Sequence, residues 1–330
     1  MNSGKHMFGV IFAMIALVLS LAGCGAGAET GGGDLQEVKY GGQYYPGEFL
    51  LKGQPDLWGP STVEHILFSS GTENNQALIS DQIHINVGSD SKTASLFAAI
   101  PDKALIIATT QRGDRYSTIV KADSPYQSWE DLKGKTVGTR LGSGAEQVLL
   151  RYFDQTDGLS WDDFEWVNLK VEEMTPALDN GSIEAFTAWE PTPAIAESQD
   201  IGRALRSYGD IALVPVSMHT TVEYAENHRA EIVNFLAAHI KKVEMIQSDP
   251  DKAAELAAKA ASAQGVEVNA DAFKRIFDRV DFSLEVDDGA LDSIRSTIEF
   301  LHSQDKLDSV PELKWDNSFL EEAKKLAEGN

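Results

Sequence analysis

Three short clusters in the sequence place serine and glycine where a β-type run gives way to a helical pattern: Ser69–Thr72, Gly88–Ser91 and Leu141–Gly144. A helix that begins at such a cluster presents free N–H groups and a partial positive charge, which suit an anionic head group. The hydroxyls add donors, and glycine lets the backbone approach a ligand closely. Serine at a helix start is also an ordinary cap, so one cluster alone is weak evidence. Three in succession predict a shared binding site.

Three arginines are the nearest candidates for a charged clamp on a sulfonate or a carboxylate. Arg140 stands just before the third cluster, which favours a role in binding. Arg112 and Arg115 lie near an expected chain crossover, where a hinge salt bridge is an equally good interpretation.

Aromatic side chains supply further candidates. Trp189 could form a wall of the site while Glu190 accepts hydrogen bonds from an amine, or Trp189 could pack in the core while Glu190 caps a helix. Tyr44 and Tyr45 could give an amphipathic wall with hydroxyl donors, or could be aromatic residues of a surface turn. For Trp189 with Glu190, and for Tyr44 with Tyr45, the sequence leaves both the binding role and the structural role open.

Nothing in the sequence assembles a catalytic or metal centre. The histidines after residue 24 are scattered, and no H-E-x-x-H motif or P-loop occurs, so we expect no metal, no cofactor and no ATPase activity in this chain. A serine in Gly88–Ser91 with His219 as its base would suit an exported serine hydrolase, but no G-x-S-x-G elbow is present. We therefore expect a protein that is not an enzyme. The hydrolase and a structural lipoprotein without a ligand are the alternatives from other classes.

The elements that must position these residues alternate between β-type and helical patterns from Val38 to about Leu213. The predicted strands are Val38–Tyr40, Ile66–Ser69, Ile83–Val87, Ala104–Thr109, Ser117–Lys121, Thr136–Thr139, Phe164–Asn168, Ala185–Trp189 and Ile211–Val216. The predicted helices between them are Glu73–Ser80, Lys92–Ala99, Ala145–Gln155 and Glu173–Asn180. This alternation predicts an α/β fold with mainly parallel sheets flanked by helices.

The last third of the chain is helical. The predicted helices there are Ala230–Gln247, Asp251–Ala261, Asp271–Val280, Ala290–His302 and Ser318–Ala327. In the fourth of these, Leu291, Ile294, Ile298 and Leu301 fall on one face. These helices could form a separate bundle or pack back against the first sheet.

The first residues of the chain predict export and a lipid anchor. Lys5 precedes the uncharged run Met7–Leu21, which suits the apolar region of a signal peptide spanning residues 1–23. The run ends in Leu21-Ala22-Gly23-Cys24, which resembles the lipobox of bacterial lipoproteins and makes Cys24 the lipidation site. The glycine-rich residues 24–37 predict a flexible tether. An ordinary secretory signal is the alternative; either way the expected location is extracytoplasmic.

Charge and cysteine content exclude several classes. The formal net charge of -23 argues against nucleic acid, which requires concentrated Lys and Arg. Cys24 is the only cysteine, so the exported domain has no disulfide and depends on its core for stability.

Three segments resemble the solute-binding proteins of the alkanesulfonate, taurine, nitrate and thiamine-pyrimidine import family. They are FSSGTENNQALISDQIHINVGS, IIATTQRGDRYSTIVKADSPYQSWEDLKGKTVGTRLGSGAEQVLLRYF and ALDNGSIEAFTAWEPTPAIAE, within a resemblance that covers about residues 38–250. The resemblance implies a two-lobed type II periplasmic binding protein fold with a ligand between the lobes. It also implies that residues 38–112 and 219–330 form lobe 1 and residues 113–218 form lobe 2, with crossovers near Thr109–Tyr116 and Val216–Thr220.

The same resemblance carries binding positions onto this chain. With Arg140 they are Tyr44, Tyr45, Ser70, Gly71, Ser89, Asp90, Thr110, Gln111, Ser143, Gly144, Trp189 and Glu190. The chain departs from the family's usual helix after the first strand, and a carboxylate at Asp90 would repel an anion.

The expected function is therefore a monomeric, lipid-anchored solute-binding protein of an ABC importer. Its partners are a small-molecule ligand, a membrane permease and the permease's ATPase. The expected ligand is a small sulfonate or amino-sulfonate such as taurine, and a heteroaromatic such as a thiamine-precursor pyrimidine is the alternative.

Overall fold

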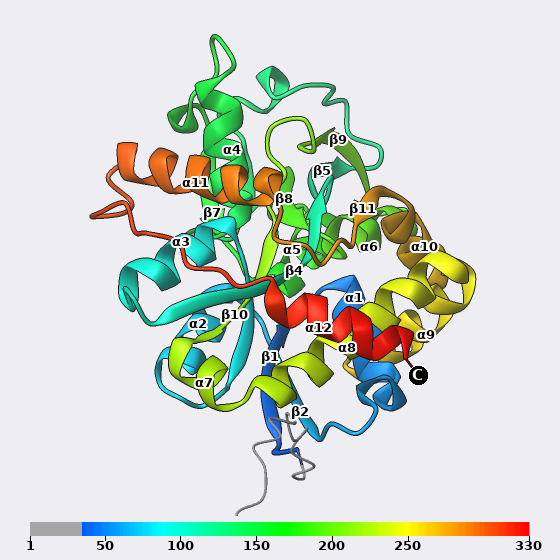
Figure 1. The fold of residues 1–330 in the computed structure, drawn as a ribbon. Coiled ribbons are helices and arrows are strands. Elements are labelled where there is room, and N and C mark those ends of the chain that lie inside the picture. Colours follow the sequence, from blue (N-terminus) through cyan, green and yellow to red (C-terminus); the bar gives the residue numbers. More distant parts are fainter. Residues whose placement is uncertain (1–34, 330) are drawn as a thin grey trace, which may run out of the picture. The chain divides into compact units, whose positions relative to one another are not determined.

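The computed structural model describes residues 35–329, which fold into two β-sheets flanked by helices (Figure 1). This confirms the predicted α/β architecture with two sheets. The expected signal peptide, the lipidation site Cys24 and residues 24–34 of the expected tether lie outside the described residues.

The first sheet has six strands, in the order β11, β4, β10, β3, β1 and β2. Strand β1 runs parallel to both β2 and β3, whereas β10 runs antiparallel to β3 and β4, and β11 antiparallel to β4. The strand bounds are β1 Val38–Gln43, β2 Val63–Phe68, β3 Ile85–Ser89, β4 Ala104–Gly113, β10 Val216–Thr221 and β11 Val280–Asp281.

The second sheet has five strands, in the order β7, β6, β8, β5 and β9. Strand β6 is parallel to β7 and β8, and β5 is antiparallel to β8 and β9. Their bounds are β5 Tyr116–Lys121, β6 Thr136–Thr139, β7 Glu165–Asn168, β8 Ala185–Trp189 and β9 Gly202–Ser207.

The expectation of mainly parallel sheets is wrong, because both sheets are mixed. The chain passes from the first sheet along β4 into β5 of the second sheet, and returns from β9 to the first sheet along β10. A strand that leaves and its neighbour that returns must run in opposite directions, so β4 and β10 pair antiparallel. In the second sheet, strand β5 lies between β8 and β9 and runs antiparallel to both.

Twelve α-helices cover these sheets in the described part of the chain. Those in the first two thirds are α1 Pro46–Gly53, α2 Gly71–Ile79, α3 Asp90–Ala99, α4 Gly144–Asp154, α5 Val171–Asp179, α6 Thr192–Ser198 and α7 Val222–Asn227. The terminal ones are α8 Arg229–Ser248, α9 Pro250–Ala263, α10 Ala270–Arg279, α11 Asp288–Ser303 and α12 Ser318–Glu328. Short 3-10 turns occupy Pro55–Trp58, Glu130–Leu132 and Trp161–Asp163.

The predicted strand Ile211–Val216 is wrong, because residues 208–215 form no strand and β10 begins only at Val216. Pro215 has no N–H to donate to a sheet, and Val214 has a positive φ of 42° that extended strands do not use. The sequence patterns do not predict strands β9 and β11 or helices α1 and α6.

The terminal helices pack back against the first sheet rather than forming a separate bundle. Helix α12 lies along α8, whose Phe235 ring packs on Tyr40 of β1 at a centroid distance of 4.8 Å (Figure 1). Helix α10 packs on α1 through Phe273 and Phe49, whose ring centroids are 5.9 Å apart. Within residues 35–329, no helix combines the length and the apolar character that crossing a membrane requires.

Candidate functional site

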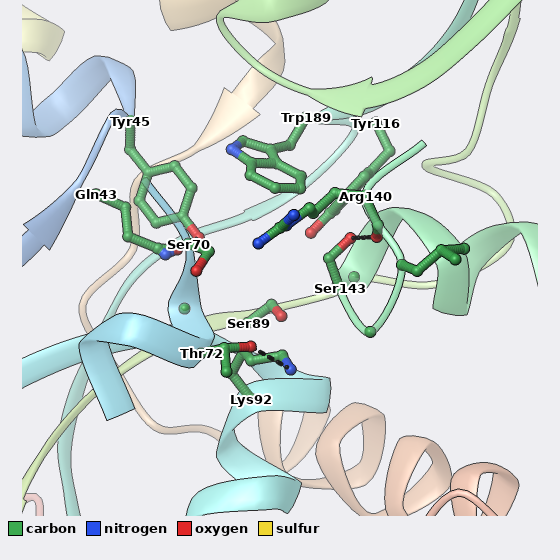
Figure 2. A pocket seen from close by; sticks show the side chains of 14 residues that line it. Gln43, Tyr45, Ser70, Thr72, Ser89, Lys92, Tyr116, Arg140, Ser143 and Trp189 are labelled. Atoms are coloured by element: carbon green, nitrogen blue, oxygen red, sulfur yellow. Dashed lines mark hydrogen bonds between the residues drawn. The ribbon is translucent and has the colours of Figure 1, made fainter. Parts of the chain in front are cut away.

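The carboxyl ends of β2, β3 and β6 lead into helices α2, α3 and α4, and the first residues of all three helices line one pocket. We call it the polar pocket (Figure 2). It is lined by Gln43, Tyr45, Ser70, Gly71, Thr72, Ser89, Lys92, Tyr116, Arg140, Leu141, Gly142, Ser143, Gly144 and Trp189. The predicted convergence of the three serine-glycine clusters is therefore observed.

The three serines have different hydrogen bonds. The Ser70 Oγ accepts from the Glu73 N–H at 3.3 Å, so Ser70 caps α2. Ser143 caps α4 by accepting from the Ala145 N–H at 3.1 Å, and its hydroxyl donates to the Arg140 carbonyl at 2.6 Å. Ser89 makes no cap and lies 3.1 Å from the Ser91 Oγ. Capping and ligand contact are compatible, because a capping oxygen engages one N–H of the first turn and leaves the others without an intrahelical partner.

Glycine is required at the start of α4. A Cβ atom on Gly144 would lie 2.2 Å from the Tyr116 hydroxyl and 3.3 Å from the Ser89 Oγ. Tyr116 belongs to the second sheet and Ser89 to the first. The absence of a side chain at residue 144 therefore lets the start of α4 approach the end of β3 across the site.

Two cations face the polar pocket, and no Asp or Glu occurs among the described residues that line it. Figure 2 shows the Arg140 side chain reaching toward the middle of the pocket, between Trp189 and Ser89. No carboxylate of residues 35–329 pairs with the Arg140 guanidinium. The Lys92 Nζ donates to the Thr72 Oγ1 at 3.2 Å.

The environment of Lys92 disfavours its charge. Burial lowers the pKa of Lys92, the nearby Glu146 opposes this, and the charge of Arg140 lowers it further. The two oxygens of Glu146 are already engaged, one by the Gly142 N–H at 2.7 Å and the other by the Lys306 Nζ at 2.8 Å. An anion between Lys92 and Arg140 would relieve the repulsion between them.

Aromatic rings form another part of the lining of the polar pocket, which we call the aromatic wall. Tyr45, Tyr116 and Trp189 are all almost fully buried, and the rings of Tyr116 and Trp189 meet edge to face at 6.3 Å. The Tyr45 hydroxyl donates to the Gln43 Oε1 at 2.6 Å.

Arg115 lies behind this aromatic wall and holds it. Its guanidinium carbon lies 5.5 Å from the Tyr45 ring centroid and 4.5 Å from that of Tyr116, and its Nη2 donates to the Tyr116 hydroxyl at 2.9 Å. Burial raises the pKa of Tyr116 to about 12, which keeps its hydroxyl protonated and able to donate. Arg112 instead pairs with Asp281 and Asp287, so the salt-bridge interpretation holds for Arg112.

Eight of the thirteen predicted binding residues line the polar pocket: Tyr45, Ser70, Gly71, Ser89, Arg140, Ser143, Gly144 and Trp189. That they bind a ligand stays a prediction. The other five, Tyr44, Asp90, Thr110, Gln111 and Glu190, do not line it.

The two predicted carboxylates have protein partners instead. Asp90 is fully buried; its Oδ1 accepts from the Ser91 N–H at 2.7 Å and its Oδ2 from the Thr297 hydroxyl at 2.6 Å. Burial raises the pKa of Asp90, so a neutral carboxyl is favoured there more than in water. Glu190 accepts from the Ala194 N–H at the start of α6 and pairs with Arg279 of α10.

The remaining three have other partners. The Thr110 hydroxyl accepts from the buried Lys242 Nζ at 3.0 Å, and Gln111 pairs with Val216 between β4 and β10. Tyr44 packs on Phe49 with a centroid distance of 6.0 Å and lines a different cavity.

Sequence reasoning missed six lining residues: Gln43, Thr72, Lys92, Tyr116, Leu141 and Gly142. A signal for Lys92 existed, because it stands three residues after Ser89 and helical side chains lean toward the helix start. Thr72, Leu141 and Gly142 belong to the clusters already singled out. The sequence held no comparable signal for Tyr116, whose position depends on the pairing of β5 with β8.

His219 is fully buried on β10 and pairs with Asn86 of β3. Its Nδ1 lies 2.8 Å from the Asn86 Oδ1 and its Nε2 lies 2.9 Å from the Thr93 Oγ1. Burial lowers the pKa of His219 to about 3. Both ring nitrogens therefore have partners other than Ser89 and Ser91. No group of three or more His, Cys, Asp or Glu residues within residues 35–329 could hold a metal ion.

A family model described as NMT1/THI5 like matches residues 71–253. A "Putative aliphatic sulfonates-binding protein" of Bacillus subtilis (strain 168) is 26% identical over 257 residues, which cover 74% of this chain and 76% of that protein. A protein of the same description from Escherichia coli (strain K12) is 25% identical over 212 residues, covering 64% and 65% of the two chains.

Solved structures share the fold. The alkanesulfonate-binding protein SsuA from Xanthomonas axonopodis pv. citri bound to MOPS gives a TM-score of 0.73 at 18% identity, covering 83% of this chain and 95% of that one. The desulfurization enzyme DSZB gives a TM-score of 0.64 at 15% identity, covering 88% and 99%. The fold is thus found in a binding protein and in an enzyme.

The buried imidazole predicts a specific dependence of stability on pH. The pKa of His219 is about 3 in the folded protein and about 6.5 in the unfolded chain, so the unfolded chain binds the extra proton between these values. This contribution to stability is present above pH 6.5 and is lost as the pH falls. Between pH 6 and 4, urea titrations should show that the advantage of wild type over His219→Gln shrinks by about 1.4 kcal/mol per pH unit.

Thr93→Val is the matched control, because it removes a partner of His219 and leaves the imidazole in place. Its difference from wild type should change with pH much less than that of His219→Gln. Equal pH slopes for wild type and His219→Gln would contradict the assignment of a buried neutral imidazole.

Proposed function

The chain belongs to the NMT1/THI5-like family, and from this we propose that it is the extracytoplasmic solute-binding protein of an ABC importer and that it binds a sulfonate. The relatives from Bacillus subtilis and Escherichia coli, both described as aliphatic sulfonates-binding proteins, support the class of ligand. A taurine-like amino-sulfonate is one such ligand.

One observation carries this proposal: a protein with a formal net charge of -23 has a pocket lined by two cations and by no carboxylate of the described chain. Three helix N-termini add partial positive charge at the same place. A sulfonate is a permanent anion with three oxygens, which can accept hydrogen bonds from several directions at once. Arg140, Lys92 and the serine hydroxyls supply donors from different sides.

We propose that the ligand bridges two lobes, residues 38–112 with 219–330 and residues 113–218. Lys92 follows β3 of the first sheet and Arg140 follows β6 of the second, so one anion between them would draw the lobes together. The chain would act as a monomer. The closed form would then dock on a membrane permease whose ATPase supplies the energy.

We propose binding rather than catalysis, although the fold also occurs in DSZB. The imidazole of His219 is engaged by Asn86 and Thr93, and its low pKa makes it a poor base. Residues 35–329 contain no cysteine. Among the described residues around Ser89 and Ser91, His219 thus does not serve as the base that a serine hydrolase would need to activate its nucleophile.

A lipid anchor at Cys24 is a separate proposal, based on the sequence Leu21-Ala22-Gly23-Cys24. Expression in a bacterial host with a radiolabelled fatty acid should label the wild-type protein and leave Cys24→Ser unlabelled. The variant should also leave the membrane fraction. Equal labelling of both proteins would contradict the anchor.

Loss of the arginine should weaken sulfonate binding. Charge-assisted hydrogen bonds contribute about 1.5–3 kcal/mol each, so Arg140→Gln should raise the dissociation constant for ethanesulfonate about 10- to 100-fold in calorimetry. Lys259→Gln removes a positive charge from the exposed surface of α9 and is the matched control; it should leave the affinity close to wild type.

The same titrations separate the two ligand classes. A heteroaromatic ligand would depend more on Trp189 than on Arg140, because its ring would stack on the indole. If a pyrimidine binds and ethanesulfonate does not, the sulfonate proposal is wrong. If Arg140→Gln binds ethanesulfonate as tightly as wild type does, the proposed role of Arg140 is wrong.

A further inference from the structure

Arg115 is a buried cation to which the proposed function gives no role in binding. Its side chain is 1% exposed, and no carboxylate of residues 35–329 forms a salt bridge with its guanidinium. Its Nε donates to the Val214 carbonyl at 3.2 Å and its Nη2 to the Tyr116 hydroxyl at 2.9 Å, whereas its Nη1 has no hydrogen-bond partner in the described chain. Burying a charge without a paired carboxylate is costly, and an apolar side chain would fill the same space without that cost.

The hydrogen bond from Arg115 limits where the Tyr116 proton can point. A guanidinium is always a donor, so the Tyr116 oxygen accepts at this contact and its own proton must point elsewhere. Burial raises the pKa of Tyr116 to about 12, although the charge of Arg115 lowers it, so the hydroxyl keeps its proton near neutral pH. Tyr116 is therefore a hydroxyl donor whose acceptor is not Arg115.

The Tyr116 hydroxyl lies in the polar pocket. Tyr116 is one of the lining residues, and Figure 2 shows its ring directed toward the middle of the pocket, beside Arg140. A Cβ atom on Gly144 would lie 2.2 Å from the hydroxyl, which places the oxygen at the start of α4. An anion held beside Arg140 at this helix start would be an acceptor for the Tyr116 proton.

Tyr45 is a second tyrosine beside the same guanidinium, but its proton is already used. The Arg115 guanidinium carbon lies 5.5 Å from the centroid of the Tyr45 ring and 4.5 Å from that of Tyr116, and both rings line the pocket. The Tyr45 hydroxyl donates to the Gln43 Oε1 at 2.6 Å. The two tyrosines therefore differ in whether the chain itself provides the acceptor.

We propose that the Tyr116 hydroxyl donates to the bound anion and that Arg115 is the residue that positions this hydroxyl. The inference rests on the proposed function and adds two residues to its site. An anion oxygen that accepts from Tyr116 at about 2.7 Å would lie within about 6 Å of the Arg115 guanidinium. Arg115 thus polarises the donor and adds its own positive charge to those of Arg140 and Lys92.

Removal of a single hydroxyl provides the first test. In calorimetry with ethanesulfonate, Tyr116→Phe should raise the dissociation constant about 10- to 100-fold, because a hydrogen bond to an anion is lost. Tyr45→Phe removes a hydroxyl that donates to Gln43, so the dissociation constant should rise at least about threefold less than for Tyr116→Phe. Equal losses in the two variants would contradict the assignment of the donor to Tyr116.

A double-mutant cycle tests the positioning role of Arg115 separately. Arg115→Met keeps an unbranched side chain and removes the charge and the donors, so it should weaken ethanesulfonate binding about tenfold. In the Tyr116→Phe background the same change should cost at least about threefold less, because no hydroxyl remains to be positioned. If Arg115→Met costs the same in both backgrounds, Arg115 holds the ring or the fold and does not act through the hydroxyl.

Arg112→Met is the matched control for the loss of an arginine. Its guanidinium pairs with Asp281 and Asp287 and does not line the polar pocket, so the affinity should stay close to wild type. Thermal melting establishes that each variant folds, and the comparison of the two tyrosine variants needs no change at Arg115.

The outcomes distinguish this inference from the proposed function. If wild type and Tyr116→Phe bind ethanesulfonate with equal affinity, the inference is wrong and sulfonate binding stands. If wild type binds no sulfonate, the proposed function fails and this inference fails with it.

Discussion

The site depends on a local excess of positive charge that the protein does not neutralise. Arg140 and Lys92 face the same pocket, the charge of Arg140 lowers the pKa of Lys92, and no carboxylate of the described chain lies among the lining residues. In a chain with 51 acidic and 28 basic residues, a pocket that gathers two cations and no carboxylate is completed by an external anion. The three helix starts add to the same field.

The two sheets hold the cations and helix starts of the polar pocket from two sides. The strands β3 and β6, from different sheets, deliver Lys92 and Arg140, and Gly144 permits their helix starts to approach. Buried contacts fix the surroundings: Arg115 holds the tyrosine wall, and Asp90 binds Thr297 of α11. These contacts hold the side chains around each donor in place within its own sheet and helices. Such preorganisation lowers the free-energy cost of binding.

Local patterns predicted the elements that carry the site, and long-range pairing decided the rest. Strands such as β6 and β8 and the caps Ser70 and Ser143 could be located because alternation and capping are local properties. The mixed sheets could not, because strand direction depends on where the chain returns. Asp90 follows a serine at a helix start, as a ligand residue would, yet its carboxylate turns to a threonine 207 positions away. No local signal in the sequence indicates that partner.

The central claim is that one anion is held between Lys92 and Arg140. A crystal structure of the protein grown with ethanesulfonate tests it most directly. We expect the sulfonate oxygens to lie about 2.7–3.2 Å from the Arg140 guanidinium and the Lys92 ammonium, with at least one N–H of a helix start completing the shell. A sulfonate bound outside the polar pocket, or one that leaves both cations in contact with solvent, would contradict the account.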